Sequence, residues 1–281
     1  MVVVNLQQLS FTPKTANTSI LGPIDIQLTE GEWLGIFGGN GSGKSTLAQL
    51  LCGWLPELMS GELTGTGDVF SLPLTEGNLV TLSTQRQLIQ QSPQLQLSGC
   101  TFSVEQEIAF GPENQGIPEE QIYQRVDEAI ALTHCETLRH RHPSTLSGGE
   151  AQRVVIASAL AMQPKLLLLD EAFNRLTPKA THSLLINLKN YTHKTGCSVI
   201  LFERHLLPAF GFCQQVMLLD AGKTIASIDR QRVFAAAQST VNMPDAWRAL
   251  GYLINQHGWN INIPNNDDEL LHVLKDKYAA I

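Results

Sequence analysis

Hydrophobic residues in this chain form two kinds of pattern, continuous apolar runs and repeats at helical spacing. The continuous runs are typical of central parallel strands covered on both faces, and they occupy residues 33–37, 166–169 and 197–202. Helical spacing predicts helices over residues 44–54, 154–162 and 178–191. Residues 2–9 and 20–28, with turn signals between them, indicate antiparallel strands. The pattern therefore predicts an α/β fold with an antiparallel β portion.

The middle and the end of the chain differ from this core. Residues 61–88 are rich in Thr, Ser and Gly and predict a second small antiparallel portion. From 93 to 142 the apolar positions recur every three or four residues, so we expect two or three helices inserted between core strands. Strands at 216–219 and 224–228 close the core. We expect a main domain over residues 1–240, with a helical part at about 93–160, and a small C-terminal extension over 241–281.

A glycine-rich loop joins the first apolar run to the helix that begins at Lys44. From Gly38 to Ser45 it matches G-x-x-x-x-G-K-[ST]. Glycines allow successive N–H groups to turn toward an anion, and the helix adds its positive end. A triphosphate fits such a loop, with Lys44 at the β- and γ-phosphates and the Ser45 hydroxyl on Mg²⁺. The expected nucleotide-binding residues are Gly38, Asn40, Gly41, Ser42, Gly43, Lys44, Ser45 and Thr46.

Two carboxylates follow the apolar run at 166–169. Asp170 and Glu171 would lie at the carboxyl end of a central strand, where α/β folds bind ligands. We expect Asp170 to hold Mg²⁺ through water and Glu171 to polarise the water that attacks the γ-phosphate. His205 lies just beyond the run at 197–202, which favours a γ-phosphate contact. The alternative for Asp170 and Glu171 is a solvated turn, and the alternative for His205 is a purely structural role. The presence of a phosphate loop in the same chain favours the functional interpretation of all three residues.

Three further features have a functional and a structural interpretation. Residues 147–149, Ser-Gly-Gly, precede an apolar helix and form either a second anion site or an ordinary capped helix. The phosphate loop favours the anion site. Phe11 lies on the first predicted turn, where it either stacks on an adenine ring or packs on the sheet. Three histidines and a cysteine within residues 134–142 match no zinc spacing and indicate a polar helix end.

Composition narrows the class of protein. The chain has 281 residues, 43% of them hydrophobic, and a formal net charge of −7. It has no run of Lys and Arg, which argues against nucleic acid and anionic lipid as partners. No apolar stretch is long enough to cross a bilayer and the start does not resemble a signal peptide, so we expect a cytoplasmic protein without a membrane span. The five cysteines form no C-x-x-C pair and are expected to be reduced.

Five motifs in a fixed order resemble the nucleotide-binding subunit of an ATP-binding-cassette transporter. They are the Walker A loop (38–45), the Q-loop (Gln91), the signature (146–152), the Walker B strand (166–171) and the switch histidine (His205). The resemblance implies an ATPase with a P-loop NTPase (RecA-like) core, ATP and Mg²⁺. It implies catalytic roles for Glu171, His205 and Gln91, and metal contacts from Ser45, Gln91 and Asp170. Two such cassettes close head to tail, which implies that Ser147, Gly148 and Gly149 touch ATP held by the other subunit.

Within that family the chain resembles energy-coupling-factor ATPases. Residues 103–114, S-V-E-Q-E-I-A-F-G-P-E-N, are similar to their T-V-E-E-D-V-A-F-G-P-E-N stretch, and residues 264–270 resemble their P-L-T-x-E-E-L ending. Those ATPases power vitamin or metal-ion uptake through a transmembrane coupling protein and a substrate-capture protein. The resemblance implies these two partners, a second ATPase subunit, identical or not, and a peripheral location on the cytoplasmic face of the cell membrane.

The chain departs from the family pattern at three places. Residues 174–177, N-R-L-T, end in threonine where the family has Leu-Asp, Arg204 stands where Thr precedes the switch histidine, and the adenine loop around Phe11 is short. Two other functions stay open, a soluble cassette acting on DNA or ribosomes and a regulatory ATP-binding subunit with little turnover. The short gap between Gln91 and Ser147 and the single cassette argue against the first.

Overall fold

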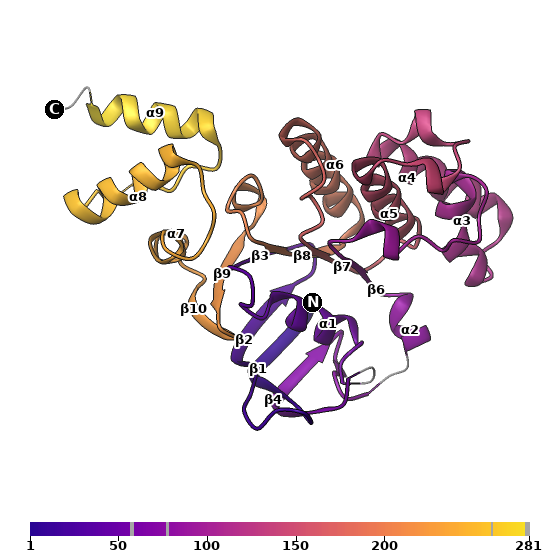
Figure 1. The fold of residues 1–281 in the computed structure, drawn as a ribbon, viewed down its shortest axis with the longest axis horizontal. Coiled ribbons are helices and arrows are strands. Elements are labelled where there is room, and N and C mark those ends of the chain that lie inside the picture. The colour runs from indigo at the N-terminus through magenta and orange to yellow at the C-terminus, as the bar shows by residue number, and fades with distance from the viewer. Residues whose placement is uncertain (57–58, 77–78, 260, 279–281) are drawn as a thin grey trace. The chain divides into compact units, whose positions relative to one another are not determined.

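A computed structural model describes residues 1–56, 59–76, 79–259 and 261–278 (Figure 1). The chain divides into two compact units. Unit 1 is made of residues 1–75 and 200–281, and unit 2 of residues 76–199. The chain returns from unit 2 to unit 1 within strand β8 (Ser198–Glu203). Each unit carries part of the motifs found in the sequence.

The predicted antiparallel strands form a four-stranded sheet in unit 1. Its order is β2-β1-β4-β5, with bounds β1 (Val2–Pro13), β2 (Leu21–Thr29), β4 (Gly61–Val69) and β5 (Leu72–Pro73). In β2 the buried and solvent-facing residues alternate, as expected of a sheet with one covered face. In β1 the register shifts between Leu6 and Leu9, and Gln8 has a φ of 50°. A bulge at this point changes which side chains face the core.

A parallel pair in unit 1 carries the phosphate loop. Strand β3 (Trp33–Phe37) is buried at every position and pairs in parallel with β9 (Gln215–Asp220), with Leu34 opposite Gln215. Strand β10 (Lys223–Ser227) pairs with β9 in the antiparallel direction. Helix α1 (Lys44–Cys52) follows the loop and ends at Gly53, which takes a left-handed conformation. The strand, loop and helix predicted from the sequence are confirmed.

The C-terminal residues form three helices in unit 1, α7 (Arg230–Ala237), α8 (Asp245–His257) and α9 (Asp267–Tyr278). Trp247 is fully buried, with its ring centroid 6.2 Å from that of Phe234. Its indole N–H donates to Asp267 at 2.7 Å. Asn266 caps the last helix, because its Oδ1 accepts from the Glu269 N–H at 2.9 Å. These contacts join α7, α8 and the start of α9.

Unit 2 combines two parallel strands with the predicted helices and with one short helix, at Leu79–Ser83, that was not predicted. Strand β6 (Arg86–Ile89) pairs in parallel with β7 (Leu166–Asp170), whose five residues are all buried. The helices are α2 (Leu79–Ser83), α3 (Val104–Asn114), α4 (Glu119–Thr133), α5 (Gly148–Ala161) and α6 (Pro178–Thr195). Single 3₁₀ turns occur at Pro93–Leu95, Glu136–Leu138 and Pro143–Thr145 in this unit, and at Ala209–Phe212 in unit 1. Helices α3, α4 and α5 pack together, which confirms the helical insertion (Figure 1).

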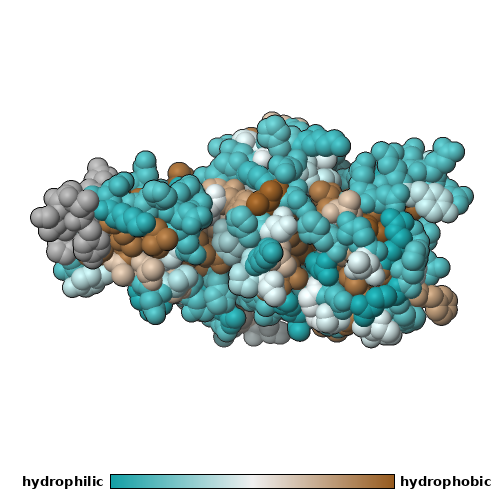
Figure 2. Space-filling view, turned by 90° about the horizontal axis from the view of Figure 1, so that it is seen from above, coloured by the Kyte–Doolittle hydropathy of each residue, from teal (hydrophilic) through white to brown (hydrophobic). Residues whose placement is uncertain are grey.

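The surface and the cysteines complete this picture. Hydrophilic residues cover most of the face in Figure 2, and hydrophobic residues form small patches between them. In the part of the chain that the structure describes, we find no helix with the length and apolar character of a membrane span. All five cysteines are free thiols, and only Cys100 is exposed. Burial raises the pKa of the Cys197 thiol to about 12 and that of the Cys135 thiol above its usual value.

Candidate nucleotide site

The phosphate loop follows β3 directly, and its glycines are needed for its shape. Gly41 and Gly43 have φ angles of 76° and 99°, a region that side chains rarely adopt. A Cβ at Gly38 would lie 2.3 Å from the Leu219 carbonyl oxygen. The Gly38 N–H donates to the Glu203 carbonyl at the end of β8, at 3.2 Å. Within unit 1, the loop therefore packs closely against β9 and is hydrogen-bonded to the end of β8.

Lys44 lies inside this loop. The side chain is buried, and Nζ donates to the carbonyl oxygens of Gly38 and Gly39 at 2.8 and 2.9 Å. The N-cap residue of α1 is Gly43, which has no side chain to cap the first N–H groups of the helix. The loop thus gathers an ammonium group and uncapped helix N–H groups, which is the chemistry that binds phosphate. The Ser45 hydroxyl is exposed beside them, and Asn40 is exposed at the loop tip.

His205 lies in the same unit as the phosphate loop. It follows β8 by two residues, is exposed, and forms an isolated parallel bridge with Asn242. The backbone N–H of Leu206 donates to the Asn242 carbonyl at 2.9 Å, and Asn242 N–H donates to the Arg204 carbonyl at 3.1 Å. The start of the C-terminal extension therefore fixes the backbone on both sides of this histidine.

Phe11 does not lie where the sequence placed it. The turn was expected at residues 10–13, but β1 continues to Pro13, and Phe11 pairs with Leu21 and is fully buried. Its ring also occupies the space above Gly61, where a Cβ would lie 2.4 Å from Cε2. A fully buried ring offers no face to an adenine, so the adenine interpretation of Phe11 is corrected. The alternative, packing on the sheet, fits this position.

The carboxylate pair lies in unit 2. Asp170 is the last residue of β7, and Glu171 follows it with a φ of 50°, an uncommon angle for a residue with a side chain. Both residues are buried. Glu171 Oε2 accepts from Gln91 Nε2 at 3.2 Å and from Asn174 Nδ2 at 2.6 Å. The structure therefore brings Gln91 to Glu171, two residues separated by 80 positions in the chain.

The signature residues form the start of α5. Ser147 and Glu150 make a reciprocal capping box, in which Ser147 Oγ accepts from the Glu150 N–H at 3.4 Å and Glu150 Oε2 accepts from the Ser147 N–H at 2.7 Å. Glu150 Oε1 also accepts from Arg141 Nη1 at 2.7 Å. Hydrogen bonds from Ser147 and Arg141 lower the pKa of Glu150. A Cβ at Gly149 would lie 2.9 Å from the Arg175 carbonyl oxygen, so the turn fits only glycine there.

A buried carboxylate fixes the segment that follows Gln91. Glu107, on α3, accepts three hydrogen bonds, from the Ser98 N–H at 2.6 Å, the Ser98 hydroxyl at 2.7 Å and the Thr101 hydroxyl at 2.6 Å. Sequence reasoning missed both this residue and Asn174. A signal for Asn174 existed, because it lies three positions after Glu171 in a loop, within reach of its carboxylate. No comparable local signal marks Glu107, whose partners come from the preceding loop.

Comparison with known proteins decides what these motifs represent. The family model described as ABC transporter matches residues 21–174, more than half of the chain. The chain belongs to the ABC transporter family. It is accordingly an ABC ATPase, since ATP-binding subunits of this family hydrolyse ATP.

Three relatives of the chain illustrate the match. Energy-coupling factor transporter ATP-binding protein EcfA1 of Lactococcus lactis is 30% identical over 280 residues, 98% of each chain. The structure of cbiO1 from Clostridium perfringens, part of the ABC transporter complex cbiONQ, has a TM-score of 0.73 at 27% identity and covers 91% of this chain and 95% of that one. An ABC transporter ATP-binding protein of Methanosarcina mazei is 33% identical over 233 residues, 83% of this chain, and the chain spans 40% of that longer relative.

Family membership confirms the predicted resemblance and the P-loop NTPase fold. The individual roles of the site residues stay predictions. Unit 1 holds Lys44, its loop and His205, while unit 2 holds Gln91, Asp170, Glu171 and the signature turn. Ser147 caps α5, and Gly148 and Gly149 are its first two residues. The capped helix predicted from the sequence is therefore present, and the second interpretation, an anion site at the same turn, is compatible with it.

Proposed function

We propose that this chain is the ATP-hydrolysing subunit of an energy-coupling-factor importer for a vitamin or a metal ion. The observation that carries the proposal is the end-to-end similarity to an energy-coupling factor ATP-binding protein, combined with an intact loop around Lys44 and an intact Asp170-Glu171 pair. In this proposal, the chain lies on the cytoplasmic face of the membrane and acts through a transmembrane coupling protein and a substrate-capture protein. A second ATPase subunit completes its nucleotide sites.

The residues present suit ATP with Mg²⁺. The uncapped start of α1 and the ammonium of Lys44 suit the phosphates, and the three donors proposed for the metal, Ser45, Gln91 and Asp170, are oxygen ligands of the kind Mg²⁺ prefers. When bound, Mg²⁺ neutralises charge on the β- and γ-phosphate oxygens. Lys44 would exchange its bonds to two loop carbonyls for bonds to phosphate. Its ammonium therefore remains satisfied in both states.

Glu171 acts in this proposal on the attacking water. Its carboxylate oxygen Oε2 is held by the side-chain amides of Gln91 and Asn174, which limits the directions the carboxylate can face. A carboxylate in a fixed direction can orient and polarise a water molecule, while His205 would contact the γ-phosphate. Gln91 would then connect the nucleotide to the segment between residues 92 and 103, which leads into α3. Glu107 on α3 holds this segment through its hydrogen bonds from Ser98 and Thr101.

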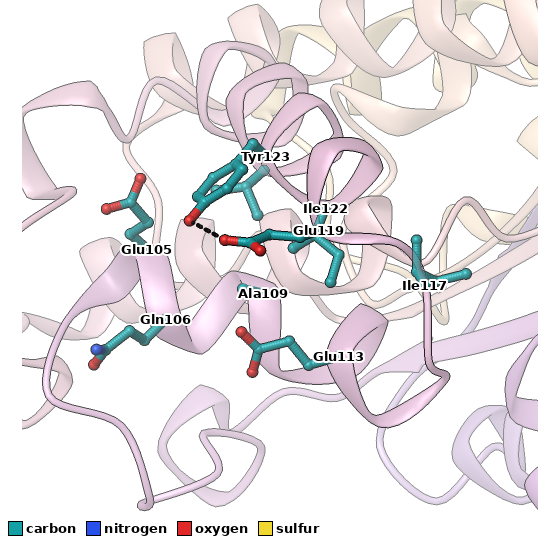
Figure 3. Close-up of a pocket in the computed structure, with 9 residues that line it drawn as sticks. Glu105, Gln106, Ala109, Glu113, Ile117, Glu119, Ile122 and Tyr123 are labelled. Atoms are coloured by element: carbon teal, nitrogen blue, oxygen red, sulfur yellow. Dashed lines mark hydrogen bonds between the residues drawn. The ribbon is translucent and has the colours of Figure 1, made fainter.

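The helical insertion is the proposed docking site for the transmembrane partner. A cavity of about 520 Å³, open to solvent, lies between helices α3 and α4. Its rim carries the carboxylates of Glu105, Glu113 and Glu119, and Tyr123 donates to Glu119 at 2.9 Å (Figure 3). Ala109 and Ile122 supply an apolar floor. An acidic rim around an apolar floor suits a partner segment with basic and apolar side chains.

The proposal is tested by ATP hydrolysis of the chain alone and of the complex that it forms with co-purified membrane proteins. We expect turnover in the complex, loss of turnover with retained ATP binding in Glu171→Gln, and loss of ATP binding in Lys44→Ala. An amide keeps the shape of the carboxylate but polarises water poorly. Near-normal hydrolysis by Glu171→Gln would remove Glu171 from this role. Purification without any membrane protein and with little turnover would favour the soluble or regulatory alternatives.

A further inference from the structure

Arg175 lies against the signature turn of its own chain. A Cβ built on Gly148 would lie 3.2 Å from Arg175 Nη1 and 3.3 Å from its Cδ, and a Cβ on Gly149 would lie 2.9 Å from the Arg175 carbonyl oxygen. All three residues belong to unit 2. The side chain of Arg175 therefore extends over the first turn of α5, and the two glycines leave room for it.

A second side-chain donor lies near this turn besides Arg175. The side-chain amide nitrogen of Gln94 lies 3.9 Å from the same Cβ position on Gly148. Glu150, the acidic residue of the first turn, is already bonded to the Ser147 N–H and to Arg141. Arg175 is exposed and makes no hydrogen bond or ion pair with another residue that the structure describes. The guanidinium of Arg175 is thus held at a helix N-terminus where the described carboxylate, that of Glu150, is bonded to other groups.

This arrangement has an energetic consequence. The N-terminal end of a helix carries a partial positive charge, so a cation beside it is destabilising and an anion is stabilising. A guanidinium group also binds phosphate oxygens through two parallel hydrogen bonds, which an ammonium group cannot do. A phosphate placed over the turn would therefore satisfy Arg175 and the helix end together.

We propose that Arg175 is a further phosphate-binding residue of the ATP site, and that it contacts the γ-phosphate of the nucleotide held by the opposite ATPase subunit. This rests on the proposed function, in which the signature residues face that nucleotide. The signature turn offers backbone N–H groups and one hydroxyl, all of them uncharged. Arg175 adds a full charge to them, so it increases the preference of the closed pair for ATP over ADP.

The test uses ATP-driven association of the Glu171→Gln chain, which is expected to bind ATP without hydrolysing it. Light scattering gives the ATP concentration at which half of the chain is dimeric, and the membrane complex gives the ATP concentration for half-maximal hydrolysis. We expect Arg175→Ala to raise both about tenfold, the change that corresponds to one lost charge-assisted hydrogen bond. Arg175→Lys should restore part of the loss. Lys194→Ala, which removes one exposed positive charge at the far end of α6, is the matched control and should change neither value.

A mixing experiment separates the two subunits. A Lys44→Ala chain cannot hold ATP in its own loop but still presents its signature turn to the other chain. Paired with an intact chain, it should associate more weakly when it also carries Arg175→Ala, and the same substitution in the intact chain should have little effect. ATP binding by the isolated chain at low concentration should not depend on Arg175 at all.

Each result bears on a different claim. If the Glu171→Gln chain associates with ATP, or the complex hydrolyses ATP, and Arg175→Ala changes the half-maximal concentration less than twofold, Arg175 does not bind phosphate while the proposed function stands. An effect of Arg175 confined to the chain that carries the intact Lys44 loop would also overturn the contact across the pair. If the Glu171→Gln chain does not associate with ATP and the membrane complex with Glu171 and Arg175 intact does not hydrolyse ATP, the proposed function fails and this proposal fails with it.

Discussion

Glu171 owes its position to two side-chain amides and to an uncommon backbone angle. Gln91 and Asn174 both donate to Oε2, at 3.2 and 2.6 Å, and the residue adopts a φ of 50°. Such angles cost free energy and persist where the surrounding structure enforces them. Other described residues, Gln8 and His134 among them, also have a positive φ, and Glu171 is the one to which the proposed mechanism assigns water activation.

Replacement of Asn174 by alanine tests this arrangement. We expect Asn174→Ala to lower kcat about tenfold with little change in KM, because the carboxylate loses the shorter of its two bonds and its direction becomes less fixed. Steady-state hydrolysis by the membrane complex gives both constants. Asn190→Ala, an exposed asparagine on α6, serves as the control. A KM increase at constant kcat would indicate that Asn174 supports nucleotide binding instead.

Phe11 shows why a residue can be misplaced from sequence. Alternation of apolar residues was visible, but the irregularity at Gln8 was not, and it shifts the buried positions from Val4 and Leu6 to Leu9 and Phe11. A shift of one residue reverses the face of every later side chain in a strand. By contrast, Lys44, Asp170 and Glu171 were predictable, because their spacing and the adjoining apolar strands are encoded within a few residues.

At the scale of elements, the sequence predicted the strands and helices that have long apolar patterns. Helices α3 to α6 and strands β3 and β7 were expected, since each buries several regularly spaced residues. Helices α2 and α7 were not, because both are short: α2 has a single buried residue, Leu82, and α7 spans only residues 230–237. Tertiary contacts, which a local pattern does not contain, stabilise such short helices.

Glu107 offers an element-scale prediction. Glu107→Ala leaves the Ser98 and Thr101 donors without their common acceptor, so we expect it to reduce the free energy of unfolding by about 3 kcal/mol. Chemical denaturation monitors this change, with Glu120→Ala on the exposed side of α4 as the control. We also expect the complex to hydrolyse ATP with less transport per ATP, because α3 is no longer fastened to the segment after Gln91. Unchanged stability and coupling would assign Glu107 no such role.

Charge reversal on the rim of the α3–α4 cavity tests the docking proposal. We expect Glu113→Lys to reduce recovery of the membrane partners at least several-fold, because it places a positive charge opposite a basic partner segment. Glu120→Lys makes the same charge change on a neighbouring residue that does not line the cavity, and it should leave recovery unchanged. Crosslinks from the transmembrane partner that fall only on residues 241–281 would contradict docking at the helical insertion.

At the scale of the whole molecule, Thr177 predicts an asymmetric pair of ATPases. Thr177 Oγ1 accepts from the Ala180 N–H at 3.3 Å and caps α6, with Pro178 as its first residue, so it can fill the capping role that the aspartate of the family pattern would have. It has no carboxylate to offer across the pair. We therefore expect this chain to work best beside a different ATPase subunit that retains Leu-Asp at this position.

The measurement compares hydrolysis and uptake by complexes built from the unmodified chain alone, from Thr177→Asp alone, and from each with the sister subunit. Thr177→Asp should raise the activity of the pair of identical chains about tenfold or more, and it should change little when the sister is present. Stability serves as the control, because both residues can cap a helix and Thr177→Asp should therefore not reduce the free energy of unfolding. A pair of unmodified identical chains that drives uptake as well as the Asp variant would refute the asymmetry.

The three hydrogen bonds on Glu107 also set a time scale for the loop that connects Gln91 to α3. The backbone amide of Ser98 can exchange its hydrogen with solvent only when its bond to this carboxylate opens. Since the hydroxyls of Ser98 and Thr101 hold the same carboxylate, that opening is a concerted event rather than a local fluctuation. The exchange rate of one amide, followed with and without ATP, therefore reports how readily this segment separates from α3.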